Sequence, residues 1–160
     1  TVVEERTQGT LPFLLSLPVS PREYTIAKIA ANLLIFLAPW TFLLLGTFAV
    51  IAGSASVPDG LIPYAALLMG EMFVGYAIVL AVAIVSESQG WTIGAIIATN
   101  LLFQACLYGF SHMPTLAGTL EHNVIRWSPL VLSILGGEVL VIFALLGLTL
   151  YLQGRKTDFV

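Results

Sequence analysis

Charged side chains are scarce in this chain of 160 residues: six are Lys or Arg and nine are Asp or Glu, which together make up 9% of the sequence. A soluble domain typically has about a quarter of its residues charged. The net charge of −3 also leaves no basic surface that could neutralise nucleic-acid phosphates. The composition therefore argues against both a soluble domain and a nucleic-acid-binding protein.

The residues that build metal and nucleotide sites are almost missing as well. The single cysteine, Cys106, has no partner for an internal disulfide, and the two histidines, His112 and His122, both lie in one polar stretch. The sequence has no His-Glu-x-x-His motif and no Gly-x-x-x-x-Gly-Lys-Ser/Thr loop. The first apolar run is broken by prolines, so we expect it not to be a signal peptide. We therefore expect no metal, no cofactor and no catalysis in this chain.

Hydrophobic residues, in contrast, make up 58% of the sequence, and the mean hydropathy is +0.98. A chain of this length cannot bury so much apolar surface in one core, so lipid must be the solvent for much of it. Four apolar segments, at residues 24–53, 61–85, 91–110 and 129–152, are each long enough to cross a hydrocarbon layer of about 30 Å as a helix. The sequence predicts a single all-α transmembrane domain over residues 1–160.

Turn and capping residues separate these segments. Ser20-Pro21-Arg22-Glu23 is a capping box that predicts the start of the first long helix, and Pro39 predicts a kink within it. Residues 53–60 and 86–90 have turn composition. Ser128-Pro129 is expected to cap the last span.

The longest connector, residues 111–128, carries one apolar stripe at helical spacing. Leu116, Leu120, Val124 and Trp127 form this stripe, and polar residues occupy the other faces. It predicts a short interfacial helix lying on the bilayer before the last span.

The distribution of Lys and Arg predicts the orientation. Four spans place both ends of the chain on one side, and that side carries all but one of the basic residues, namely Arg6, Arg22, Lys28, Arg155 and Lys156. Only Arg126 lies on the other side. By the positive-inside rule we expect a multi-pass protein of the cell (inner) membrane with both ends of the chain cytoplasmic.

Four polar residues lie inside the predicted spans: Glu71, Asn100, Gln104 and Glu138. Ionisable groups at the bilayer centre cost about 2.5–3.5 kcal/mol and normally face protein or a water-filled cavity. The helical rise places Glu71 and Glu138 at similar depth, and Asn100 and Gln104 one turn apart. These four residues are candidates for a translocation path. Interhelical hydrogen bonding, with both carboxyl groups protonated or paired, explains the same pattern.

One stretch near the start is apolar but too broken to span a membrane. It reads Glu5-Arg6-x-x-Gly9-Thr10-Leu11-x-x-Leu14-Leu15-Ser16-Leu17-Pro18-Val19-Ser20-x-x-Glu23 and is followed by Lys28. This order of a Gly-Thr break, a Leu-Leu-Ser-x-Pro-Val-Ser run and a capping box resembles the cytoplasmic segment of ABC transporter permeases of the ABC-two superfamily. The remaining spans are similar to that family only in hydropathy and spacing.

The resemblance implies a function and partners. In that family the segment joins the second and third of six membrane helices and forms the coupling helix that docks on the ATP-binding subunit. Residues 9–20 would be the coupling segment, and this chain would contain the last four of six spans, as a fragment or a truncated permease. The residues implied in coupling are Thr10, Leu11, Phe13, Leu14, Leu15, Leu17, Pro18 and Glu23. The implied protein is a non-catalytic permease subunit of an exporter, working as a homodimer or heterodimer, with ATP bound by a partner chain.

Two other hypotheses fit the residues. Four spans with two intramembrane acids also suit a small proton-coupled multidrug transporter that uses Glu71 or Glu138. A membrane scaffold without transport activity is the third. The sequence does not identify the substrate, since apolar spans are compatible with lipids, drugs, hydrophobic peptides or ions.

Overall fold

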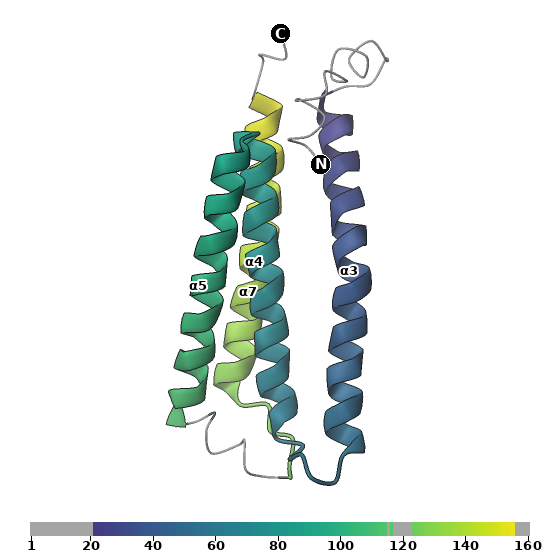
Figure 1. Ribbon diagram of the computed structural model, residues 1–160, viewed down its shortest axis with the longest axis vertical. Helices are drawn as coiled ribbons and strands as arrows, with labels where there is room; N and C mark the ends of the chain where they lie inside the picture. The colour runs from purple at the N-terminus through teal and green to yellow at the C-terminus, as the bar shows by residue number, and fades with distance from the viewer. Residues whose placement is uncertain (1–20, 115, 117–122, 156–160) are drawn as a thin grey trace.

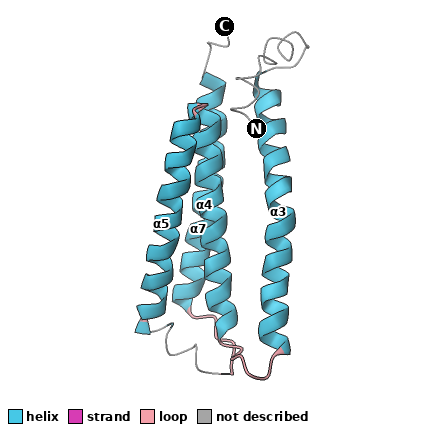
Figure 2. Cartoon of the chain, in the orientation of Figure 1, coloured by secondary structure: helices cyan, strands magenta, loops and turns pink. Residues whose placement is uncertain are grey.

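The fold consists of four long helices that run along one another. The computed structural model describes residues 21–114, 116 and 123–155. The helices are α3 (Pro21–Gly53), α4 (Leu61–Ser86), α5 (Gln89–His112) and α7 (Pro129–Arg155), labelled as in Figure 1. All four are long and apolar enough to cross a membrane. The described part of the chain contains no strand (Figure 2), and the predicted all-α membrane fold is confirmed.

The helix ends agree with the local sequence signals. α3 begins at Pro21, inside the predicted capping box, and continues without interruption through Pro39 to Gly53. The backbone N–H of Val131 donates a hydrogen bond to Oγ of Ser128 at 3.3 Å, so Ser128 caps α7 as expected. α4 ends where Glu87 adopts a left-handed conformation with φ of 51° and donates its N–H to the carbonyl oxygen of Ala83. This sharp reversal lets α5 begin at Gln89.

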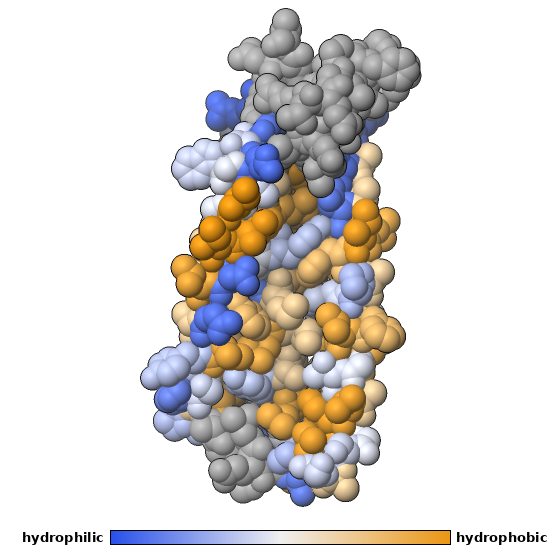
Figure 3. All heavy atoms as spheres, in the orientation of Figure 1, coloured by the Kyte–Doolittle hydropathy of each residue, from blue (hydrophilic) through white to orange (hydrophobic). Residues whose placement is uncertain are grey.

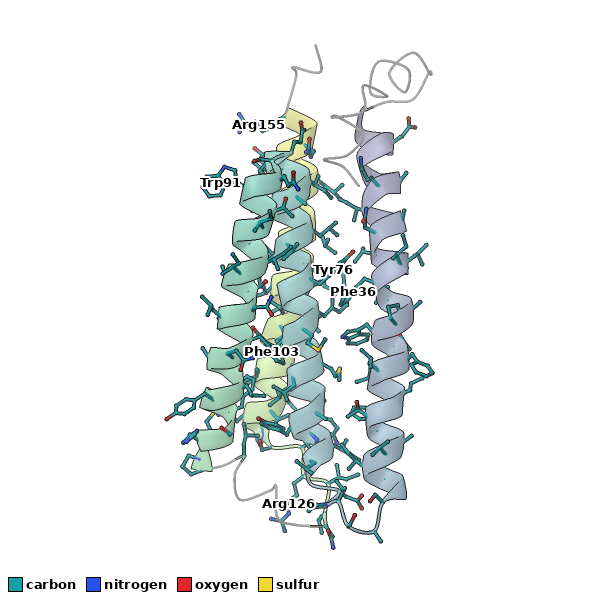
Figure 4. All side chains as sticks on the ribbon, in the orientation of Figure 1. Phe36, Tyr76, Trp91, Phe103, Arg126 and Arg155 are labelled. Atoms are coloured by element: carbon teal, nitrogen blue, oxygen red, sulfur yellow. The ribbon has the colours of Figure 1, made fainter. Side chains whose placement is uncertain are left out.

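The chain crosses the length of the bundle four times. The start of α3 and the end of α7 therefore lie at the same end, and the long connectors lie at the other (Figure 1). Arg155 and Arg126 are at opposite ends (Figure 4). Residues 1–20, which include the predicted coupling segment, are outside the described residues.

The connector before α7 differs in part from the prediction. Residues 123–128 are bends and extended backbone, so the predicted interfacial helix does not include Val124 or Trp127. Residues 117–122, the middle of that predicted helix, are outside the described range. Leu116 is buried against Leu67, Phe110 and Val131, which ties the connector to the base of the bundle. Leu116 therefore faces the interior of the bundle, and not the lipid as the predicted apolar stripe required.

α4 is the central helix of the bundle. It packs extensively against α5 on one side and α7 on another, and α3 makes fewer contacts with the rest. Val74 and Ala77 of α4 form a buried cluster with Ile142 of α7 midway along the bundle. α5 and α3 bury little of their apolar surface inside the chain. Their outer faces are therefore available to lipid or to other protein chains.

A ladder of aromatic side chains joins α3 to α4. The rings of Phe36 and Tyr76 stack with centroids 3.8 Å apart, and they meet between the two helices in Figure 4. The Tyr76 hydroxyl donates a hydrogen bond to the carbonyl oxygen of Asn32 at 2.7 Å. Nε1 of Trp40 donates to the carbonyl oxygen of Met69 at 3.0 Å. Together with the burial of Ile29 against Leu80 and Ile84, these contacts hold α3 against α4.

Candidate functional site

A cavity of about 500 Å³ lies beside the aromatic ladder, between α3, α4 and α7. Its walls are almost wholly apolar and rich in aromatic rings, contributed by Trp40, Phe48, Phe73, Trp127 and Phe143. Volumes of about 300–1,000 Å³ with a few polar groups are typical of small-molecule sites. Figure 3 shows hydrophobic residues along the visible face of the bundle, interspersed with residues of intermediate and hydrophilic character.

The one acidic residue in the cavity wall is Glu138, on α7. Its side chain is only 7% exposed. Within the described residues, neither carboxyl oxygen has a hydrogen-bond partner. Buried polar groups are nearly always hydrogen-bonded, and exceptions are found at functional sites. Glu138 is therefore the most unusual side chain in the described bundle.

The carboxyl group of Glu138 lies directly against Gly70 of α4. A Cβ atom built on Gly70 would overlap Oε2 of Glu138 and lie 2.9 Å from its Cδ. Any other residue at position 70 would require the carboxyl group to move. The glycine thus creates the space in which the acid is held between α4 and α7, as expected for small residues at helix–helix contacts.

Glu71 of α4 and Cys106 of α5 do not line the cavity. The carboxyl groups of Glu71 and Glu138 are near enough to influence each other electrostatically, and both influence the Cys106 thiol of α5. Glu71 is half-buried, whereas Glu138 is fully buried. The structure therefore brings together the two acids that the sequence placed at similar depth.

The two amide side chains of α5 lie on its exposed surface, away from the cavity. Asn100 and Gln104 are both exposed, and Nδ2 of Asn100 donates to the carbonyl oxygen of Ile96 in its own helix at 2.8 Å. Figure 3 shows hydrophilic surface partway along α5, among hydrophobic residues. No residue of α5 lines the cavity. A role in a translocation path stays a prediction for all four polar residues, but of these only Glu138 lines the cavity, with Glu71 nearby.

Of the predicted coupling residues, only Glu23 is described, and it is exposed in the first turn of α3. The others, Thr10, Leu11, Phe13, Leu14, Leu15, Leu17 and Pro18, are outside the described residues.

Sequence reasoning did not identify the polar side chains that bind neighbouring helices. Besides Trp40 and Tyr76, Gln153 of α7 is buried and donates from Nε2 to the carbonyl oxygen of Ile84 in α4. Each is a polar or polar-tipped side chain in an apolar segment, which is a usable signal for a helix contact. The partner atoms are backbone carbonyls, and these have no sequence signature.

Metal binding has no support within the described ranges, where no three His, Cys, Asp or Glu side chains come close enough to share an ion. The cavity itself offers one carboxyl group and otherwise apolar walls. This arrangement can bind a hydrophobic molecule and balance one positive charge.

Four apolar helices, three of which surround a largely apolar cavity, define a multi-pass α-helical membrane protein. The family model described as ABC-2 family transporter protein matches residues 1–134, so the chain belongs to the ABC-2 transporter family. The match covers α3, α4, α5 and the start of α7, together with the segment whose sequence resembles the coupling region. No curated protein and no solved structure matches the chain. The protein is therefore a membrane transport component.

Proposed function

We propose that this chain is the membrane-spanning, non-catalytic permease subunit of an ABC exporter, driven by a separate ATP-binding subunit. The observation that supports this most is the family match over residues 1–134, because it includes residues 5–28, the stretch that resembles the coupling region. ATP would be bound by the partner chain, and two permease chains would form a homodimer or heterodimer. The end that carries the start of α3 and the end of α7 would face the cytoplasm of a cell with an inner membrane.

The geometry of α3 suggests how a partner's motion could reach the membrane. α3 is one continuous helix of 33 residues that starts immediately after the proposed coupling segment. It is attached to α4 mainly along the ladder of Phe36, Trp40 and Tyr76. A push at its start would tilt or slide it as a rigid body against α4 and α7. Because α3 forms one wall of the cavity, this motion would open or close the cavity.

Replacing both Phe13 and Leu14 with Asp should abolish the association with an ATP-binding subunit. These two residues would be apolar anchors in a groove on the ATPase, and buried charges there have no partner. We expect at least a tenfold loss of ATPase recovered when the two proteins are co-expressed and the permease is purified by a tag.

The matched control replaces Val2 and Val3 with Asp, which adds the same charges a few residues away. It should leave the association intact. Equal recovery of the ATPase by both double variants would show that residues 11–17 are not the docking helix.

The proximity of Glu71 to Glu138, whose carboxyl group lies against the neighbouring residue Gly70, favours a second candidate function, a proton-coupled multidrug transporter. Two acids this close do not readily carry two negative charges together, so one can exchange a proton for a cationic substrate. In proteoliposomes without any ATPase, an imposed pH gradient should then drive efflux of a cationic dye, and Glu71→Gln should reduce the rate at least tenfold. The absence of pH-driven efflux from wild-type proteoliposomes would exclude this function.

A further inference from the structure

Glu138 is a buried carboxyl group for which the chain supplies no basic partner within the membrane. Lys and Arg occur only at positions 6, 22, 28, 126, 155 and 156, so none lies in α4 or α5, and α7 has only Arg155 at its end. Among the described residues, the charged group that influences Glu138 electrostatically is another acid, Glu71. A carboxylate in a low-dielectric region needs a positive charge or hydrogen-bond donors to remain ionised. Within the described residues it has neither.

The surroundings of Glu138 suit a cation that is itself hydrophobic. Glu138 and Gly70 both line the cavity of about 500 Å³, and the carboxyl oxygens are buried against Gly70 at its wall, so the side chain has to turn to present its carboxyl group to a ligand. Because the carboxyl group has no hydrogen-bond partner among the described residues, none must be broken for it to turn toward a ligand. The aromatic rings of Trp40, Phe73 and Phe143 can contact a cation through their faces.

A hydrated inorganic cation fits this cavity poorly. Ca²⁺ takes six to eight oxygen ligands and Mg²⁺ keeps several waters, and both need a polar site. The described lining provides a single carboxyl group among aliphatic and aromatic side chains. An organic cation, which spreads its charge over a hydrophobic body, loses little hydration on entry and gains contact with these walls.

We propose that the cavity between α3, α4 and α7 is a binding site for a lipophilic organic cation, with Glu138 as its counter-charge and the aromatic wall as its hydrophobic contact. The inference names a ligand class for the proposed transporter and rests on that function for its purpose. Binding itself requires no ATPase and can be measured on the isolated chain.

The test uses the full chain in lipid nanodiscs, with tetraphenylphosphonium as the probe in isothermal titration calorimetry. Glu138→Gln keeps the shape of the side chain and removes its charge, so it should raise the Kd for tetraphenylphosphonium at least tenfold. Tetraphenylborate has the same shape and the opposite charge. Its binding should not be weakened by Glu138→Gln.

A second pair of variants tests the location of the site without touching the acid. Phe143 is 70% exposed and lines the cavity, whereas Phe42 is 78% exposed and does not. Phe143→Ala should raise the Kd for tetraphenylphosphonium about threefold to fivefold, and Phe42→Ala should leave it unchanged. Circular dichroism checks that each variant retains its helix content, and if Glu138→Gln does not fold, this pair decides the outcome.

A Kd in Glu138→Gln within twofold of the wild-type value would overturn the proposal. So would an equal loss in the two Phe variants. Loss of ATPase association with retained probe binding would remove the coupling function and leave the site. Retained ATPase association with loss of specific probe binding would support the permease function and rule out the proposed cation site.

Discussion

Replacing Glu138 with Met should raise the free energy of unfolding of the helical bundle by about 1–3 kcal/mol. Glu138 is 7% exposed and its carboxyl group, among the described residues, has no hydrogen-bond partner, so the folded state bears the desolvation cost of that group. Replacing buried ionic groups by well-packed apolar residues is often stabilising by about 1–4 kcal/mol. Met is flexible and of similar length, so it can occupy the same space beside Gly70. Reversible unfolding of the purified chain in mixed detergent and SDS micelles measures the change.

Gln153 provides the matched control, because it lies on the same helix and is equally buried at 7%. Its amide donates to the carbonyl oxygen of Ile84, so Gln153→Met removes an interhelical hydrogen bond. This variant should lower the free energy of unfolding by about 0.5–1.5 kcal/mol. The prediction therefore has opposite signs at two buried polar positions of one helix. A destabilised Glu138→Met variant would mean that the carboxyl group has a stabilising partner in the folded protein.

The Glu138→Met variant should also lose binding of tetraphenylphosphonium. Gain of stability together with loss of binding is typical of residues that are kept for function. A stabilised variant that still binds the probe would separate the stability effect from the proposed site.

Replacing Gly70 with Leu should lower the free energy of unfolding by about 2–3 kcal/mol. The first side-chain atom already overlaps Oε2 of Glu138, and the rest of the side chain has to be placed between α4 and α7. Inserting atoms into a packed contact costs about 1–3 kcal/mol. The same micelle unfolding experiment measures the effect.

Gly147 of α7 is the control for this substitution, since a Cβ atom there meets nothing within 4 Å. Gly147→Leu should change the free energy of unfolding by less than about 0.5 kcal/mol. If the collision with the acid is the cause, combining Gly70→Leu with Glu138→Ala should recover part of the loss. If Gly70→Leu changes the free energy of unfolding as little as Gly147→Leu does, the contact between α4 and α7 at Gly70 is loosely packed.

The fold of this chain was predictable because its main signals are local. A membrane leaves few options for an apolar segment of more than 20 residues, since its backbone must form a helix. Ser128 and Pro21 mark helix starts because capping depends on a few neighbouring atoms. The interfacial helix over 111–128 was predicted less well. Leu116 packs into the bundle, and the backbone at Val124 and Trp127 is not helical.

The depth of the candidate site residues along their helices was predictable from the sequence. The direction in which their side chains point around each helix was not. A rise of about 1.5 Å per residue was enough to place Glu71 and Glu138 at similar depth. Spans that are hydrophobic on every side carry no signal for the direction in which a given residue points. Asn100 and Gln104 therefore received the same prediction as the acids, although they are exposed on α5.

Hydropathy, capping residues and the stretch at 5–28 are sufficient to recognise a multi-pass transporter component, because each signal is contained in a short piece of chain. The contact between Gly70 and Glu138, the aromatic ladder of α3 and the cavity beside it arise only when the helices pack. Interhelical hydrogen bonds in this bundle join residues that are far apart in the sequence: Trp40 and Met69 are separated by 29 positions, and Ile84 and Gln153 by 69. The depth of a residue in the membrane depends only on its position along its own helix. Whether its side chain faces lipid, a cavity or another helix depends on which helices pack around it.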